Sequence, residues 1–492
     1  MLLKVDIFKF YVYNIGVGDK MNELDTKLKT EFENLPADFW DFKQATTRDL
    51  THGLHYYPAI MVYPISQNIL NIVKKHFTVN SLMDPFMGSG TVLVEGMIGN
   101  IPQIYGTDLN PLAVLMSRVK TTKLSQSQLD YITQEHKIYL ENIKEKSYAV
   151  ANDFDSYIRN ELQLDVTAKK GWGDSADKYI DEYFKNKNKN FNYQTFTNLG
   201  FWFLPKTIIL LQTIKNVIKK IENIQIREFL LLAFSETVRT VSNTRNGEFK
   251  LFRMKPEKVA SFNPDVFEEY FKVLNRNIGK MQDFVNVCSD VSNVHINFDD
   301  TRSLTTIPNN SIDLVITSPP YGDSRTTVAY GQFSRLSLQW LDLDYTTQQD
   351  VANIDKNLLG GKSYCHKSQW AFLQSPTLVE SLEKIAQRDI FRADDVFSFY
   401  VDLDKCLYAI TNKMKPQSYQ FWVVGNRTVK LEKLLTDKII SEMAVKYGLK
   451  HLFSFDRNII NKVMPSLNSP SNEVGERVKT MTSEIIVVLK KE

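Results

Sequence analysis

The sequence predicts an α/β fold in which a mainly parallel, Rossmann-like sheet carries a large, mainly helical inserted domain. Two observations favour this class. Residues 66–110 alternate between helical and strand periodicity, with a glycine-containing turn after the first apolar run, which is typical of a right-handed βαβ unit. This alternation of helix and strand patterns stops near residue 125 and returns near residue 291, so we expect one sheet to continue after the inserted segment.

The first part of the sheet is predicted from four short segments. In chain order they are a helix at 66–77, a strand ending at a turn at 79–86, a helix at 90–99 and a strand ending in an acidic residue at 103–110. Residues 1–50 are interpreted as an N-terminal arm, because residues 22–50 are polar with scattered aromatic side chains. The sheet domain is therefore assigned to residues 51–124 and 291–492.

Two insertions differ from the sheet domain in composition. Residues 125–290 are rich in lysine and asparagine and have long helical periodicities, the longest at 205–239, which indicates a helical inserted domain. Residues 322–395 form a second, looser insertion. The tail then supplies a helix at 397–414, a strand at 419–426, a helix at 431–448 and strands at 450–457 and 482–491.

Composition narrows the class of protein. The chain has 492 residues, of which 43% are hydrophobic and 24% charged, and its net charge of +3 permits a polyanionic partner without requiring one. No apolar stretch approaches the roughly 20 residues of a membrane span, so we expect a soluble, cytoplasmic protein. The three cysteines (Cys288, Cys365 and Cys406) are too widely spaced for a CxxC site, so we expect neither a disulfide framework nor a metal.

A glycine turn follows the first predicted strand. The stretch "DPFMGSGT", Asp84 to Thr91, lets the backbone pass close under a ligand at Gly88 and Gly90, and the next helix presents unpaired N–H groups there. No lysine follows the glycines, so it is not a phosphate-binding P-loop. Asp108 ends the next strand about 20 residues later, where a carboxylate can bind ribose hydroxyls. The pattern favours a nucleoside-type cofactor, although the turn alone would fit any tight strand-to-helix connection.

A rigid turn follows a later strand. In "DLVITSPPYGD", residues 313–323, two prolines fix their own φ angles and end the strand, so Ser318, Pro319, Pro320 and Tyr321 form a stiff platform. Ligands of open α/β sheets bind at the carboxyl ends of the strands, which is where this platform lies. The alternative is a proline-rich strand terminator without a function.

Together these segments resemble the DNA amino-methyltransferases, which methylate the exocyclic amine of cytosine (N4) or adenine (N6) with S-adenosylmethionine. The resemblance covers 50–124 and 291–492, with the cofactor half before the catalytic half, and the tail departs from it at Gln417 and Ser418, where paired glycines are commoner. It implies a Rossmann-like catalytic domain. It also implies a catalytic loop of Ser318, Pro319, Pro320 and Tyr321, and cofactor contacts from His55, Pro58, Asp84, Pro85, Phe86, Gly88, Ser89, Gly90, Thr91, Asp108, Leu109, Asn110 and Asp300.

The resemblance further implies that 125–290 reads the DNA sequence, with help from 322–395. The expected partner is double-stranded DNA with its target base flipped out, in a restriction–modification or defence system; whether a cognate restriction endonuclease exists stays open. The stretch 241–254, together with Arg239 just before it, is the strongest candidate for contact with DNA, and an ordinary basic hairpin is the equal alternative. The DNA-binding candidates are Arg239, Arg245, Lys250, Arg253 and Arg325.

The chemistry implied by the resemblance is amine activation. Ser318 Oγ and the Pro319 carbonyl would accept the two amine hydrogens while Tyr321 stacks on the base, and no covalent intermediate is expected, since no cysteine follows a proline. Serine at position 318 is the family's commoner choice for cytosine N4, so we expect that target, with adenine N6 as the alternative. Further alternatives are an RNA or protein methyltransferase and a non-catalytic DNA-binding protein.

Overall fold

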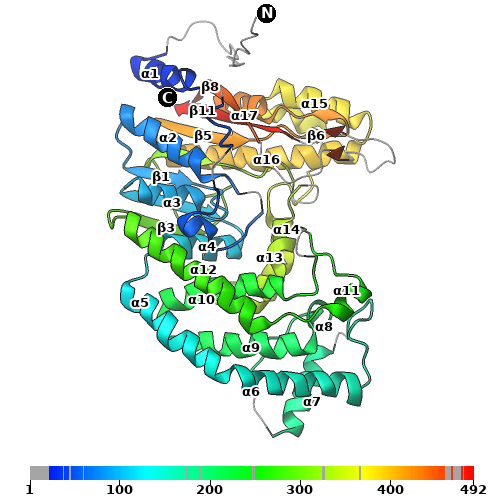
Figure 1. Cartoon of the computed structure of the whole chain (residues 1–492). Coiled ribbons are helices and arrows are strands. Elements are labelled where there is room, and N and C mark those ends of the chain that lie inside the picture. Colours follow the sequence, from blue (N-terminus) through cyan, green and yellow to red (C-terminus); the bar gives the residue numbers. More distant parts are fainter. Residues whose placement is uncertain are drawn as a thin grey trace, which may run out of the picture.

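The computed structural model describes residues 21–492 except 37, 44–45, 59, 173–174, 189–190, 246–247, 249, 324–326, 365–366, 460–466, 469–477 and 480. A seven-stranded sheet lies in one half of the molecule, and a layer of helices forms the other half (Figure 1). The strand order is β3 (Asn293–Phe298), β2 (Gln103–Asp108), β1 (Ser81–Asp84), β4 (Ile312–Thr317), β5 (Met414–Val424), β11 (Ser483–Lys491) and β8 (Leu449–Asn458).

The strands from β3 to β5 pair in parallel, and β11 runs antiparallel to both of its neighbours. The sheet order reverses at β1, from which β2 and β4 lie on opposite sides. Parallel strands buried on both faces require apolar runs, and β4 shows this with buried Leu314, Val315 and Ile316 in succession. The expected Rossmann-like α/β class is confirmed.

Two hydrophobic clusters cover the two faces of the sheet. Leu82 and Leu314 point into one cluster, whereas their neighbours Met83 and Val315 point into the other, as the two-residue period of a strand requires. On the first face lie α2 (Tyr63–His76), α3 (Thr91–Ile98) and α4 (Pro111–Thr121). On the second face lie α15 (Pro376–Ala386), α16 (Ile390–Lys413) and α17 (Thr436–Ala444).

The helical insertion packs against the helices that cover the first of these faces. Its buried side chains belong to the same continuous cluster as those of α2 to α4, so it shares one core with the sheet. The helix expected at 205–239 is broken at 220–223, because the Asn223 side chain accepts the Ile226 N–H and starts a new helix. Its helices are α5 (Gln126–Asp130), α6 (Lys137–Ser156), α7 (Ala176–Asn186), α8 (Leu199–Trp202), α9 (Pro205–Lys219), α10 (Ile224–Thr240), α11 (Pro256–Ser261) and α12 (Val266–Val287).

The second insertion is divided between the two halves. Helices α13 (Tyr330–Leu341) and α14 (Gln348–Asn357) stand between the helical layer and the sheet, whereas α15 packs on α16 (Figure 1). In the N-terminal arm, α1 (Glu23–Glu33) lies against α2 and β8. Asp25 anchors α1, because its buried carboxylate accepts hydrogen bonds from Lys490 Nζ at 2.9 Å and Tyr419 OH at 2.7 Å.

The remaining described elements are short. They are the helical turns at Leu50–Gly53, Tyr131–His136, Tyr157–Glu161, Lys367–Leu373 and Val445–Tyr447, and the strands β6 (Thr428–Val429), β7 (Glu432–Lys433), β9 (Leu467–Asn468) and β10 (Val478–Lys479). Within the described part of the chain, no helix is both long enough and apolar enough to span a membrane.

Candidate active site

The glycine turn joins β1 to α3 with two left-handed residues. Gly88 has φ 47° and Gly90, the N-cap of α3, has φ 78°. A Cβ on Gly90 would lie 2.9 Å from Ser117 Oγ, so the close approach of α4 also excludes larger residues. Asp84 Oδ1 accepts hydrogen bonds from the Phe86 N–H at 3.1 Å and from Thr317 Oγ1 at 2.7 Å. Asp84 therefore ties the ends of β1 and β4 together.

Asp108 closes the turn from the end of β2. Its Oδ2 accepts the Gly88 N–H at 3.0 Å and its Oδ1 accepts the Asn110 N–H at 2.7 Å. Burial raises the pKa of Asp108 to about 6 and the pKa of Asp84 to about 7. Two carboxylates thus lie at one sheet edge, and neither forms an ion pair with a described lysine or arginine. A cationic or hydroxyl-rich ligand would stabilise them there.

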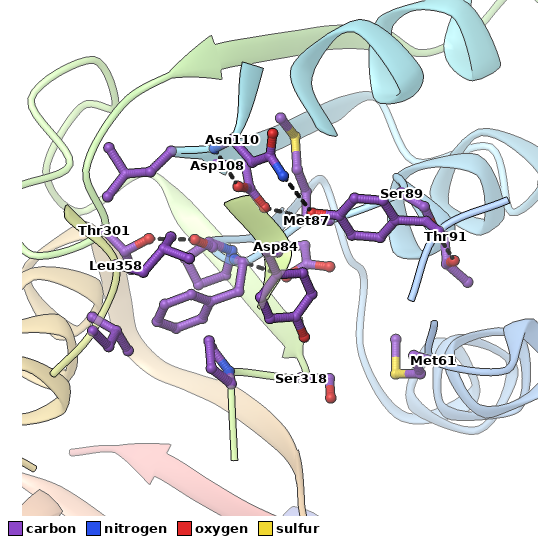
Figure 2. Close-up of a pocket in the computed structure, with 18 of the residues that line it drawn as sticks. Met61, Asp84, Met87, Ser89, Thr91, Asp108, Asn110, Thr301, Ser318 and Leu358 are labelled. Carbon is purple, nitrogen blue, oxygen red and sulfur yellow. Dashed lines mark hydrogen bonds between the residues drawn. The ribbon is translucent and has the colours of Figure 1, made fainter. Parts of the chain in front are cut away.

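A cavity opens between these strand ends and the helices beyond them, and Figure 2 shows Asp84, Asp108 and Ser318 facing it from β1, β2 and the segment after β4. Among its described lining residues are three carboxylates and no lysine or arginine. It is lined by Tyr57, Ile60, Met61, Asp84, Pro85, Phe86, Met87, Gly88, Ser89, Thr91, Asp108, Leu109, Asn110, Asp300, Thr301, Ser318, Pro320, Tyr330, Leu358 and Leu359.

Most of the predicted cofactor residues therefore meet in one place, but three of them, His55, Pro58 and Gly90, are absent from the lining. His55 is buried outside the cavity lining: its Nδ1–H donates to the Tyr56 carbonyl at 2.6 Å, so its Nε2 accepts the Ser235 hydroxyl of α10. Burial lowers the pKa of His55 to about 4, which keeps the ring neutral. Pro58 is also buried and outside the lining. The structure thus gives His55 a role in joining the sheet domain to the insertion.

Tyr57, two residues after His55, lines the cavity in the place where His55 was expected. Its ring is 5.8 Å from that of Tyr330, and its hydroxyl accepts Asn110 Nδ2 at 3.0 Å. Met61, two residues before α2 begins, lines the same cavity (Figure 2). The stretch "HGLHYYPA" was the sequence signal for this wall, whereas nothing local marked Tyr330 or Leu358, which come from the second insertion.

Asp300 lines the cavity but already has a partner. Arg302 Nη2 lies 2.6 Å from Asp300 Oδ2, and Arg302 Nη1 lies 3.1 Å from Asp402 Oδ2 on α16. A carboxylate has about four acceptor positions, so this ion pair orients Asp300 and leaves it capacity for a ligand N–H. The neighbouring Thr301 hydroxyl donates to the Pro85 carbonyl and braces the glycine turn.

The platform at 318–321 leaves β4 at the same edge. Ser318 and Pro320 line the cavity, whereas Pro319 and Tyr321 are not among its lining residues. Two residues on, buried Asp323 is held at 3.1 Å by both Arg392 and Arg427. A Cβ on Gly322 would lie 2.0 Å from Arg427 Nη1, so a larger residue at this position would displace the guanidinium that holds Asp323. The platform is therefore fixed at both ends.

Two of the predicted DNA-contacting arginines point into the protein. Arg239 Nη1 donates to the Phe333 carbonyl at 2.7 Å, its guanidinium lies 3.8 Å from the Phe333 ring centroid, and burial lowers its pKa to about 10. Arg253 Nε donates to the Phe201 carbonyl at 2.8 Å. Because these guanidinium groups are already paired with carbonyls, the structure favours a packing role for both side chains.

Arg245 and Lys250 lie at the surface, between the two strands of a bridge in the insertion. Thr244 and Arg253 form an antiparallel bridge, and the Arg245 N–H donates to the Phe252 carbonyl at 2.8 Å. Arg245 and Lys250 are exposed, and Arg245 pairs with Glu248 at 3.3 Å. Arg325, the remaining candidate, lies outside the described residues. Across the described ranges, no group of three or more His, Cys, Asp or Glu side chains could hold a metal ion.

The chain is similar over nearly its full length to the type II methyltransferase M.MvaI of Kocuria varians: 42% identical over 484 residues, covering 96% of this chain and 98% of that protein. The type II methyltransferase M.MjaII of Methanocaldococcus jannaschii is 25% identical over 349 residues, covering 62% of this chain and 65% of that protein. No protein-family model matches. Among solved structures, the rRNA methyltransferase aviRa of Streptomyces viridochromogenes aligns with 89% of this chain over 88% of its own length. The two are 9% identical, and the TM-score is 0.25. By its similarity to the first of these proteins, the chain belongs to the type II methyltransferases.

Proposed function

We propose that this chain methylates the exocyclic N4 amine of cytosine at a specific DNA sequence. As a type II methyltransferase it is a site-specific DNA methyltransferase of the restriction–modification type, and S-adenosylmethionine is its methyl donor. Methylation of the cytosine N4 amine is proposed because Ser318, directly after β4, faces the cavity that Asp84 and Asp108 also line.

The lining of the cavity fits S-adenosylmethionine. Its three carboxylates suit a cationic molecule with ribose hydroxyls and an adenine amine, and the absence of lysine or arginine from the described lining argues against a phosphate chain. Asp108 would hold the ribose hydroxyls and Asp300 the adenine amine. When bound, the cofactor supplies an electrophilic methyl group.

The chain's own residues must make the amine nucleophilic, because its lone pair is delocalised into the base. Ser318 Oγ and the Pro319 carbonyl, placed by a turn that two prolines stiffen, would accept the two amine hydrogens and favour a tetrahedral nitrogen. The base must leave the duplex to reach them, and the ring of Tyr321 is the proposed stacking surface. Arg245 and Lys250 are the proposed contacts with DNA phosphates, because both side chains are exposed at the surface.

The test is transfer of a labelled methyl group to matched duplexes, followed by mass analysis of the nucleosides. We expect N4-methyldeoxycytidine. Label on deoxyadenosine would overturn the choice of base, and the absence of any transfer to DNA would overturn the proposal itself. The Ser318→Ala variant should lose about 100-fold or more in kcat with unchanged S-adenosylmethionine affinity, because the lost acceptor acts mainly in the transition state.

A further inference from the structure

A chain of hydrogen bonds runs from the platform to the far edge of the sheet. Ser318 Oγ lies 3.3 Å from Tyr321 OH, and the Tyr321 hydroxyl donates to Glu484 Oε1 at 2.9 Å. Arg457 Nη1 donates to the other carboxylate oxygen, Glu484 Oε2, and Arg457 Nε donates to the Trp40 carbonyl at 3.1 Å. Four side chains and one backbone carbonyl thus connect the catalytic platform to the N-terminal arm.

The pair at the centre of this chain follows from strand register. Glu484 on β11 and Arg457 on β8 are direct partners across an antiparallel strand pair. Both are largely shielded, with 15% of the Glu484 side chain and 6% of the Arg457 side chain exposed. A shielded carboxylate beside a guanidinium is ionised, so Glu484 can only accept hydrogen bonds.

This fixes the direction of every bond in the chain. Tyr321 has one hydroxyl hydrogen, and it is used on Glu484. The Tyr321 oxygen must therefore accept from Ser318, whose own single hydrogen points at Tyr321. No described residue donates a hydrogen bond to Ser318 Oγ, so in the described part of the site its lone pairs stay available to a ligand, whereas its hydrogen is used on Tyr321.

We propose that Glu484 is a positioning residue that orients the Ser318 hydroxyl, through Tyr321, as a hydrogen-bond acceptor toward the substrate. This inference rests on the proposed amine methylation and deepens it. An acceptor without an available proton matches an exocyclic amine, which offers hydrogens, and does not match the carbonyl edge of thymine or uracil. It also means that Ser318 does not donate to N3 of cytosine while this chain of bonds is intact, so another group must recognise that ring nitrogen.

The informative variant is Glu484→Gln, which preserves shape but reverses the polarity. The glutamine oxygen would accept from Arg457, so its amide N–H would face Tyr321 and drive the tyrosine hydrogen toward Ser318. We expect kcat to fall by about tenfold or more, since a lost acceptor is worth at least the roughly 1.4 kcal/mol that corresponds to tenfold. Affinity for S-adenosylmethionine should not change.

A double-mutant cycle separates this role from a purely structural one. In Tyr321→Phe the hydroxyl is absent, so adding Glu484→Gln should change kcat by less than about twofold. The matched control is Glu442→Gln on α17, where the carboxylate accepts from Ser375 and Thr377 and has no contact with the platform; its kcat should equal that of the wild type.

Two results would overturn the role of Glu484 without affecting the proposed methylation. One is an unchanged kcat in Glu484→Gln, and the other is an equal fall in kcat when Glu484→Gln is added to the wild type and to Tyr321→Phe. Mass analysis of the product distinguishes these results from a failure of the proposed function. Methyl groups on a carbon atom of the base, or no methylated DNA, would refute methylation of an amine, and the inference that rests on it would fail as well. Methyl groups on the adenine amine would leave the cycle a valid test, because the same polarity applies.

Discussion

Replacing Asp84 by asparagine should stabilise the protein, and the gain should depend on pH. Asp84 is 3% exposed, and burial raises its pKa from 3.8 to about 7. The folded state therefore binds the Asp84 proton more tightly than the unfolded state does. Its contribution to the free energy of unfolding falls as pH rises between about 4 and 7.

The magnitude follows from the size of the shift. About three pKa units at ~1.36 kcal/mol each correspond to ~4 kcal/mol of ionisation cost above pH 7. At pH 5 the cost is about 1.5 kcal/mol, since only the unfolded state has then lost the proton. Asparagine keeps the oxygen that accepts from Phe86 and Thr317 and carries no charge. Asp84→Asn should therefore have a higher free energy of unfolding than wild type, and this difference should be ~2–3 kcal/mol larger at pH 8 than at pH 5.

The assay is urea unfolding of both proteins without cofactor at pH 5 and pH 8, followed by tryptophan fluorescence. The exposed Asp344→Asn is the control and should change the free energy of unfolding little at either pH. A stability difference between Asp84→Asn and wild type that is the same at both pH values, or that is larger at pH 5, would refute the reasoning.

Three further predictions follow from the same contacts. Asp108→Ala should weaken S-adenosylmethionine binding by ~1–3 kcal/mol in calorimetric titration, and unchanged affinity would contradict its assignment to the ribose. Gly90→Ala should lower the free energy of unfolding by ~1–3 kcal/mol, because the residue has φ 78° and its Cβ would meet Ser117; a denaturation midpoint equal to wild type would contradict this. Arg245→Ala should weaken DNA binding and reduce its salt slope by about one in mobility shifts, whereas Arg253→Ala should instead lower thermal stability; the opposite pattern would reverse their roles.

The sequence alone determined the local parts of the site. The glycine turn, Asp108 and the Ser318 platform each depend on a few adjacent residues whose backbone preferences are strong, so their type and position could be predicted before any contact was known. Their meeting at one sheet edge also followed, because the carboxyl ends of parallel strands share an edge. The break at Asn223 was equally local, and its N-cap signal could have been recognised.

Only the tertiary structure decided which side chains face the site. His55 and Tyr57 are two residues apart in an irregular segment, and the contact of His55 with Ser235, 180 residues away, turns Tyr57 rather than His55 to the cavity. Arg239 was turned inward by Phe333 in the same way. Glu484 reaches Tyr321 across 163 residues through strand register, which no local pattern encodes. Long-range packing sets these orientations, because burial and pairing free energies outweigh the weak rotamer preferences of a single side chain.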